Sequence, residues 1–200
     1  HYNEQVIFVE GVAPGDVVDL RITRRKKTFM EGTPIKFHEY SSARVTPFCS
    51  HYGLCGGCKW QHIDYDNQLK FKQQHVEDNL RRIAKVQLPA INPILASEQK
   101  QYYRNKLEFT FSNNRWITRE EMDASEEKVF KNGLGFHIPK RFDRILNIDH
   151  CYLQPDPSNK LRLAVNDFAL RNEYEYFDLV KQTGLLRNMI IRTSNTGQVM

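Results

Sequence analysis

The sequence lacks a long apolar run. It contains 40% apolar and 26% charged residues, and no uncharged stretch approaches the about 18 residues that a membrane-spanning helix requires. No secretory signal follows His1, because a charged start, an apolar middle and a small-residue cleavage site are all missing. Low-complexity segments and internal repeats are absent too. We therefore expect a cytoplasmic protein with no membrane partner, and the 12% aromatic content excludes a disordered chain.

The length of 200 residues allows one large domain or two small ones. The first residue is His1 rather than Met, and residues 196–200 come just after a strand-like run. Both ends look cut, so we expect a piece of a longer protein. The 29 Lys and Arg residues exceed the 24 Asp and Glu residues and give a net charge of +5, which favours a polyanionic partner.

Cysteine is scarce, and its four residues are unevenly placed. Three lie in one short segment and one lies far along the chain: Cys49, Cys55, Cys58 and Cys151. In a reducing cytosol such a group indicates metal ligands more often than disulfides. Structural zinc usually takes two separated pairs of thiolates, whereas an iron-sulfur cubane is commonly held by three ligands on one loop and a distant fourth. The spacing favours a 4Fe-4S cluster and leaves zinc as the alternative.

Glycine and histidine accompany these cysteines. Gly53, Gly56 and Gly57 lack a Cβ, so the backbone can curl around an inorganic core and point its N–H groups at sulfur. Three histidines lie close to the cysteines in sequence, and we expect them to support the site or to lie at the surface rather than to ligate: His51, His62 and His150.

Residues 1–46 contain short apolar runs separated by turn residues. We predict strands at 5–9 and 17–22, a basic turn, and further strands from residue 29 and at 35–45. Short strands at close intervals are typical of a small β-barrel of the oligonucleotide-binding type, so we predict such a barrel as a first domain over 1–46. The basic turn consists of Arg24, Arg25, Lys26 and Lys27. It is either a solvated hairpin tip or a phosphate contact.

The rest of the chain, 47–200, is predicted to form the cysteine loop and an α+β domain. A helix over 64–84 starts at Asp64 or Asp66. Its apolar stripe needs a partner surface and consists of Leu69, Val76, Leu80 and Ile83. Pro89 and Pro93 then mark a linker.

Residues 102–112 alternate as a half-buried strand does. The inner face holds Tyr103, Leu107, Phe109 and Phe111, and the outer face holds Arg104, Lys106, Glu108 and Thr110. The two outer cations suit either phosphate binding or solvation.

The remaining elements follow a polar loop or insertion at 113–132. We predict strands at 133–136 and 142–148, a helix at 158–174, and a final strand pair at 176–182 and 187–193. The candidate core residues of this helix are Leu161, Val165, Phe168 and Leu170.

Several motifs along the chain occur in the order that one enzyme family has. They are Phe8-Val9, Pro14-Gly15-Asp16, Cys49, Cys55-Gly56-Gly57-Cys58, Trp60-Gln61-His62, Tyr103-Arg104-Asn105-Lys106, Gly133-Leu134-Gly135-Phe136, Cys151-Tyr152-Leu153-Gln154, Leu186-Arg187 to Thr193, and Thr196 to Met200. This ordered set resembles the RNA uracil-5-methyltransferase family. Those enzymes use S-adenosylmethionine to methylate uridine in large-subunit ribosomal RNA or transfer RNA.

The resemblance implies an N-terminal TRAM domain, which is an RNA-binding β-barrel, and a 4Fe-4S cluster. It implies that the cluster ligands are Cys49, Cys55, Cys58 and Cys151. Two features depart from the family: its first strand would lie before His1, and the stretch 113–132 is longer than its hairpin.

Methylation at C5 of uracil requires a cysteine thiolate that adds to C6 and a base that removes the C5 proton. Every cysteine here is assigned to the cluster, and no glycine-rich turn after a strand could seat S-adenosylmethionine. In the family these parts lie in a C-terminal domain that would begin after Met200. We therefore expect this chain to be catalytically silent by itself and to position RNA, with ribosomal RNA as the partner and no obligate protein partner evident.

Two kinds of side chain are expected to contact RNA. Phosphate contacts are predicted from Arg24, Arg25, Lys26, Lys27, Arg104 and Lys106, and stacking on unpaired bases from Trp60. Tyr103 is expected to pack in the core, and the 64–84 helix to pack on the absent catalytic domain. The alternative is a stand-alone RNA-binding module stabilised by zinc or a cluster. A radical-type enzyme would need an open iron site, which four cysteines argue against.

Overall fold

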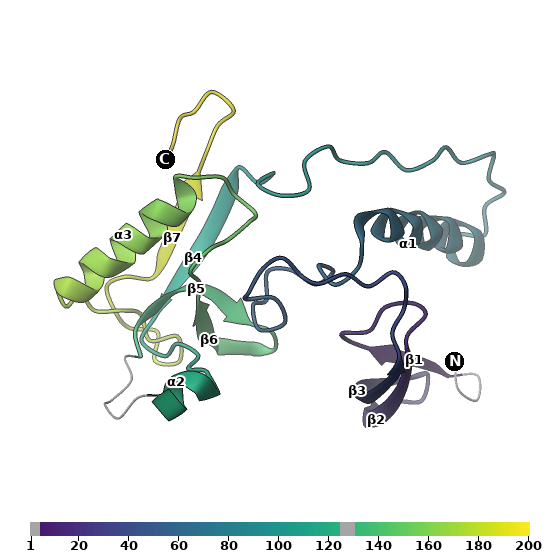
Figure 1. Ribbon diagram of the computed structural model, residues 1–200, viewed down its shortest axis with the longest axis horizontal. Helices are drawn as coiled ribbons and strands as arrows, with labels where there is room; N and C mark the ends of the chain where they lie inside the picture. The colour runs from purple at the N-terminus through teal and green to yellow at the C-terminus, as the bar shows by residue number, and fades with distance from the viewer. Residues whose placement is uncertain (1–4, 125–130) are drawn as a thin grey trace. The chain divides into compact units, whose positions relative to one another are not determined.

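A computed structural model of the chain describes residues 5–124 and 131–200 (Figure 1). The elements in chain order are β1 (Val6–Val9), β2 (Val17–Arg25), β3 (Phe29–Glu39), α1 (Tyr65–Asp78), the π-helical turn η1 (Asn79–Ile83), β4 (Lys106–Ser112), α2 (Arg119–Ala124), β5 (Gly133–Ile138), β6 (Arg141–Asn147), α3 (Ser158–Arg171) and β7 (Asn188–Arg192). No helix among the described residues is long and apolar enough to cross a membrane.

The chain divides into two compact units. Unit 1 comprises His1–Phe48 and Lys59–Ala96, and unit 2 comprises Cys49–Cys58 and Ser97–Met200. The short segment that carries three of the cysteines therefore belongs to the same unit as Cys151. These units are not necessarily domains that fold independently. The predicted division into domains 1–46 and 47–200 therefore stays a prediction.

Unit 1 contains a three-stranded sheet in the order β1-β3-β2. β1 runs parallel to β3, and β2 runs antiparallel to it. The closed barrel predicted for residues 1–46 is therefore wrong for the part of the chain that is described, because three strands leave two open edges and a barrel of the oligonucleotide-binding type needs about five. The mixed α and β content that was predicted is confirmed.

A buried ion pair holds the loops around this sheet. The Asp16 carboxylate accepts hydrogen bonds from Arg44 Nε at 2.8 Å and Nη2 at 2.6 Å, and from the backbone N–H groups of Ala13 at 2.6 Å and Ser41 at 2.9 Å. Its side chain is 1% exposed. Hydrogen bonding from Arg44 holds the pKa of Asp16 well below its ordinary value, against the opposing effect of burial. The Asp16 carboxylate is therefore ionised at neutral pH.

The predicted helix over 64–84 is confirmed. Asp64 caps α1 and accepts a hydrogen bond from the backbone N–H of Asn67 at 3.0 Å, and η1 continues the helix to Ile83. No residue of α1 or η1 is buried, and Val76 and Ile83 are exposed. The expected packing of its apolar stripe on a further domain stays a prediction.

Unit 2 contains a four-stranded antiparallel sheet in the order β6-β5-β4-β7, with α3 alongside it (Figure 1). Its core consists of Leu107, Phe109, Phe111, Leu134, Ile148, Cys151, Ala169, Tyr176 and Ile191. The predicted inward side chains Leu107, Phe109 and Phe111 are confirmed by this cluster.

Two predicted positions on the strand around β4 are wrong. Tyr103 is 54% exposed, because β4 begins only at Lys106 and the alternation does not extend back to it. Thr110, predicted to face outward, is buried because its hydroxyl pairs with His137 Nε2 at 3.2 Å. Arg104 also precedes β4, although it is exposed as predicted.

The buried face of α3 is not the predicted one. Leu161, Val165 and Phe168 are exposed, whereas Leu170 packs against the core as predicted. The buried residues of the helix are Ser158, Asn159, Arg162 and Ala169. Asn159 and Arg162 are buried here because they bind the backbone around Cys151, and Leu161, Val165 and Phe168 therefore lie on the exposed side of α3.

The final predicted strand pair is only half present. β7 forms, but 176–182 is irregular and contributes isolated bridges from Tyr176 to Leu186 and from Asp178 to Thr183. The polar stretch 113–132 includes α2, and its residues 125–130 lie outside the described part of the chain.

Candidate metal site and candidate nucleic-acid surface

The cysteine loop, Cys49–Cys58, is a series of tight turns. The backbone N–H of Tyr52 donates to Cys49 O at 3.0 Å, and that of Cys55 donates to His51 O at 2.9 Å. Gly53 lies between them with φ of +92°, a conformation that residues with a Cβ rarely adopt. The loop therefore folds on itself before it reaches the sheet.

Gly56 attaches the cysteine loop to β5. Its backbone N–H donates to His137 O at 3.1 Å. A Cβ at this position would lie 2.6 Å from the same oxygen. Only glycine permits this approach, so the sequence pattern Cys-Gly-Gly-Cys has a steric cause at its first glycine.

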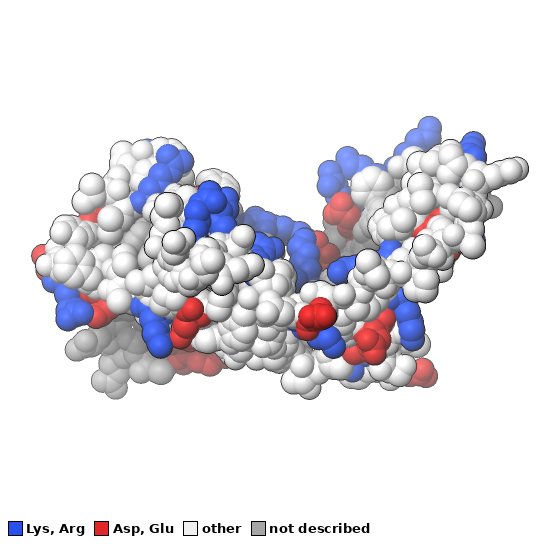
Figure 2. Space-filling model, turned by 90° about the horizontal axis from the view of Figure 1, so that it is seen from above, with Lys and Arg blue, Asp and Glu red and all other residues white. Residues whose placement is uncertain are grey.

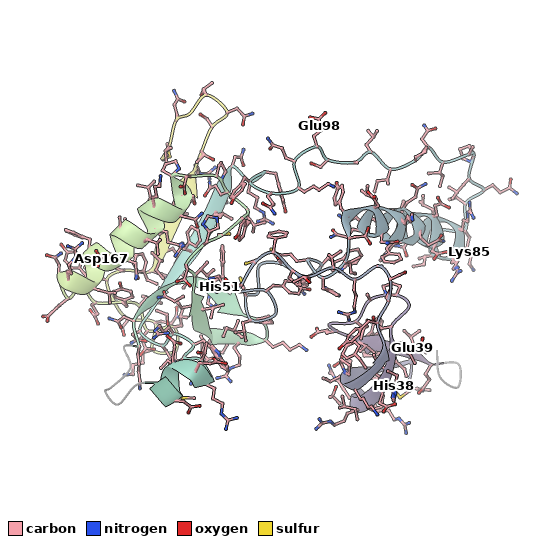
Figure 3. The ribbon with its side chains drawn as sticks, viewed as in Figure 1. His38, Glu39, His51, Lys85, Glu98 and Asp167 are labelled. Carbon is pink, nitrogen blue, oxygen red and sulfur yellow. The ribbon has the colours of Figure 1, made fainter. Side chains whose placement is uncertain are left out.

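His51 links the cysteine loop to the segment that carries Cys151. Its Nε2 accepts a hydrogen bond from the backbone N–H of Asp149 at 3.0 Å, and Figure 3 shows His51 beside the sheet of unit 2. The histidine therefore positions the two cysteine-bearing segments.

Arg162 and Asn159 hold the Cys151 segment from α3. Asn159 Oδ1 accepts from the backbone N–H of Cys151 at 2.8 Å, and its Nδ2 donates to Cys151 O at 3.1 Å. The buried Arg162 guanidinium donates to the carbonyls of Ile148 and Asp149, and it lies 5.4 Å from the centroid of the Phe109 ring. Sequence analysis missed both residues, because polar side chains on an amphipathic helix are normally read as solvent-facing.

None of the four cysteines forms a disulfide. Burial raises the pKa of Cys55 to about 11, the Gly57 N–H opposes this, and the charges of Cys58, Cys151 and Cys49 add to it. Burial also raises the pKa of Cys151. Gly57 N–H lies 3.4 Å from Cys55 Sγ. Within the described ranges, however, no group of three or more His, Cys, Asp or Glu side chains is arranged to hold a metal ion.

The predicted RNA-binding residues fall in both units. Arg24, Arg25, Lys26 and Lys27 lie at the end of β2 and in the turn after it, and all are exposed. Arg24 forms an ion pair with Glu31 at 3.3 Å. Trp60, also in unit 1, is 41% exposed. Arg104 and Lys106 are exposed in unit 2.

Arg192 is a further exposed cation beside the predicted RNA-binding residues, and sequence analysis missed it. Lys106 pairs with Arg192 across β4 and β7, and strand register cannot be read from the sequence. Figure 2 shows Lys and Arg side chains in several groups on the visible face, with Asp and Glu side chains among them.

Comparisons with known proteins find similarity to RNA methyltransferases. No protein-family model matches the chain. It is 54% identical over 198 residues to an uncharacterized RNA methyltransferase of Bacteroides thetaiotaomicron, covering 99% of this chain and 44% of that protein. It is 44% identical over 203 residues to an uncharacterized RNA methyltransferase of Porphyromonas gingivalis, covering 99% of this chain and 44% of that protein.

A solved structure is also similar. It is the Pyrococcus abyssi tRNA (uracil-54, C5)-methyltransferase in complex with S-adenosyl-L-homocysteine, which is 26% identical with a TM-score of 0.64. The match covers 97% of this chain and 40% of that one. The chain thus resembles RNA methyltransferases along almost all of its length and spans less than half of theirs.

Proposed function

We propose that this chain is the RNA-binding N-terminal part of an S-adenosylmethionine-dependent RNA (uracil-C5)-methyltransferase. The observation that carries the proposal is the similarity of nearly the whole chain to a solved tRNA uracil-C5 methyltransferase at 26% identity and a TM-score of 0.64. The exposed cations and Trp60 would bind RNA, while the thiolate nucleophile, the base and the methyl-donor pocket would belong to the part of the full-length protein that this chain does not span.

The substrate that we propose is a uridine in large-subunit ribosomal RNA, and transfer RNA is the second candidate. The structural neighbour is named for its action on tRNA, and this is the reason for keeping transfer RNA as the second candidate. The full-length protein should transfer a labelled methyl group from S-adenosylmethionine to one of two transcripts, a large-subunit ribosomal RNA fragment or a tRNA. Methylation of neither transcript, with RNA binding intact, would favour a stand-alone RNA-binding module.

We propose that Cys49, Cys55, Cys58 and Cys151 hold a 4Fe-4S cluster. The support is the donor set itself: the four cysteines lie in unit 2, none forms a disulfide, and a backbone N–H already points at Cys55 Sγ. When bound, the cluster would tie the cysteine loop to the Cys151 segment, and methyl transfer requires no redox step from it. His51 and Asn159 would position these two segments in the absence or presence of the metal.

Metal analysis tests this assignment. Protein prepared without oxygen should be brown and contain iron and sulfide in about a four-to-four ratio. A colourless protein that contains one zinc ion would show that the site binds zinc and not a cluster. The Cys151→Ser variant should lose the metal and melt at a lower temperature, and an unchanged melt with no bound metal in either protein would refute a metal site.

A further inference from the structure

The pairing of β4 with β7 places two positive charges opposite each other. Lys106 is the direct cross-strand partner of Arg192 in this antiparallel pair, and both side chains are exposed. Like charges at directly opposed positions destabilise a sheet. A surface that keeps such a pair gives up stability at this position unless an anion lies over it.

The two cations occupy the open face of the sheet. Their strand neighbours Leu107 and Ile191 are buried in the core, and successive side chains of a strand point to opposite faces. Ile190, on the same face as Arg192, is 48% exposed. We call Lys106, Ile190 and Arg192, with Arg104 just before β4, the β4–β7 open face.

The acidic side chain nearest in register is Glu108, which hydrogen-bonds a neutral amide rather than either cation. Glu108 lies opposite Ile190, and its Oε1 accepts a hydrogen bond from Asn188 Nδ2 at 2.5 Å. In the part of the chain that the structure describes, Arg104, Lys106 and Arg192 form no ion pair. The open face therefore presents three cations and one carboxylate, and none of the three cations is ion-paired with Glu108.

We propose that Lys106 and Arg192 together bind a phosphate of the RNA backbone, with Arg104 contacting the backbone beside them. This inference rests on the proposed RNA-binding function and adds Arg192 to it. A phosphate placed between the two cations replaces their mutual repulsion by attraction to a shared anion, and the contact releases counterions from the RNA. The direct opposition of Lys106 and Arg192 distinguishes this site from isolated exposed cations, which do not repel a neighbour.

The experiment measures RNA affinity and stability on the same variants of the 200-residue chain. Arg192→Gln and Lys106→Gln are compared with Lys160→Gln, a control in the same unit whose exposed ammonium pairs with Asp156 at 3.4 Å. The probe is fluorescein-labelled oligouridine RNA, titrated at several salt concentrations, and urea denaturation gives the stability.

Each of the two test variants should bind several-fold more weakly at low salt, and the slope of log affinity against log salt should fall by about 0.7 for each lost contact. Their urea midpoints should stay equal to that of the parent chain or rise. The control should change neither quantity. Arg192→Lys, which keeps the positive charge, should show the same salt slope as the parent chain.

Three results would overturn the inference. They are an unchanged affinity in Arg192→Gln, a lower urea midpoint that accompanies the weaker binding, and an equal loss of slope in Lys160→Gln. These results differ from failure of the proposed function, in which the parent chain itself would show no salt-dependent binding of the RNA.

Discussion

The two units of this chain reach order by different means. Unit 2 packs an aromatic and aliphatic core between its sheet and α3, with Phe109 and Phe111 at its centre. Unit 1 has a small buried cluster of Ala13, Ala43 and Ile63, and a buried ion pair joins its loops. The comparison indicates that unit 2 relies on apolar contacts, whereas unit 1 relies on a few polar ones that must all be satisfied.

The strands show the same contrast. Phe8 on β1 and Ile35 on β3 are exposed, so the sheet of unit 1 has apolar positions that its described residues leave uncovered. In β4 of unit 2, every position from Phe109 to Ser112 is buried. Unit 1 should therefore tolerate changes at these exposed strand positions and be sensitive at its loops, and unit 2 should be sensitive along β4.

The largest effect is expected from Phe109→Ala. This removes a fully buried ring from the centre of the unit 2 core, and we expect a loss of about 4 kcal/mol in the free energy of unfolding. Hydrogen exchange should show faster amide exchange in β4, β5 and β7. Phe8→Ala, at an exposed ring of unit 1, is the matched control, and its effect should be much smaller. An equal loss in the free energy of unfolding from the two substitutions would contradict the proposed difference between the units.

A smaller loss, about 3 kcal/mol, is expected from Asp16→Asn. The substitution keeps the shape but leaves the Arg44 guanidinium without its anion in a site where the carboxylate is 1% exposed. The increase in amide exchange should be confined to unit 1. Asp19→Asn is the control, because the ion pair of Asp19 with His38 is exposed. A similar loss in both variants would show that the Asp16 clamp has no special role.

The smallest effect is expected in acid. The pKa of Asp16 lies well below its ordinary value of 3.8, so its contribution to stability is complete above that ordinary value and is lost as the pH falls toward the folded pKa. The stability difference between the parent chain and Asp16→Asn should shrink by at most about 1.4 kcal/mol per pH unit below about pH 4. A difference that stays constant down to pH 2.5 would contradict the assigned pKa direction.

Much of the fold follows from local signals. The capping aspartate and the 3.6-residue period predicted α1, and the two-residue period predicted the inward face of β4. The grouping of three cysteines with a remote fourth predicted that these residues act together, and the structure brings all four into unit 2. The helix cap and the strand alternation depend on residues that are close in the sequence, and for this reason the sequence alone predicts them.

Other features depend on distant partners and were not readable. Leu161, Val165 and Phe168 have the spacing of a buried helix face, yet Asn159 and Arg162 take the inner side of α3 because the Cys151 backbone needs their hydrogen bonds. The sheet of unit 1 did not close, since closure depends on how many strands meet. The opposition of Lys106 and Arg192 depends on register, which no single strand encodes.

The raised pKa of Cys55, about 11, also governs how the metal-free chain behaves toward reagents. Alkylating agents and peroxides attack thiolates, and a raised pKa leaves less of that form at neutral pH. Cys55 should therefore survive handling in air and react sluggishly with iodoacetamide. Burial thus protects this sulfur from reagents that attack the thiolate.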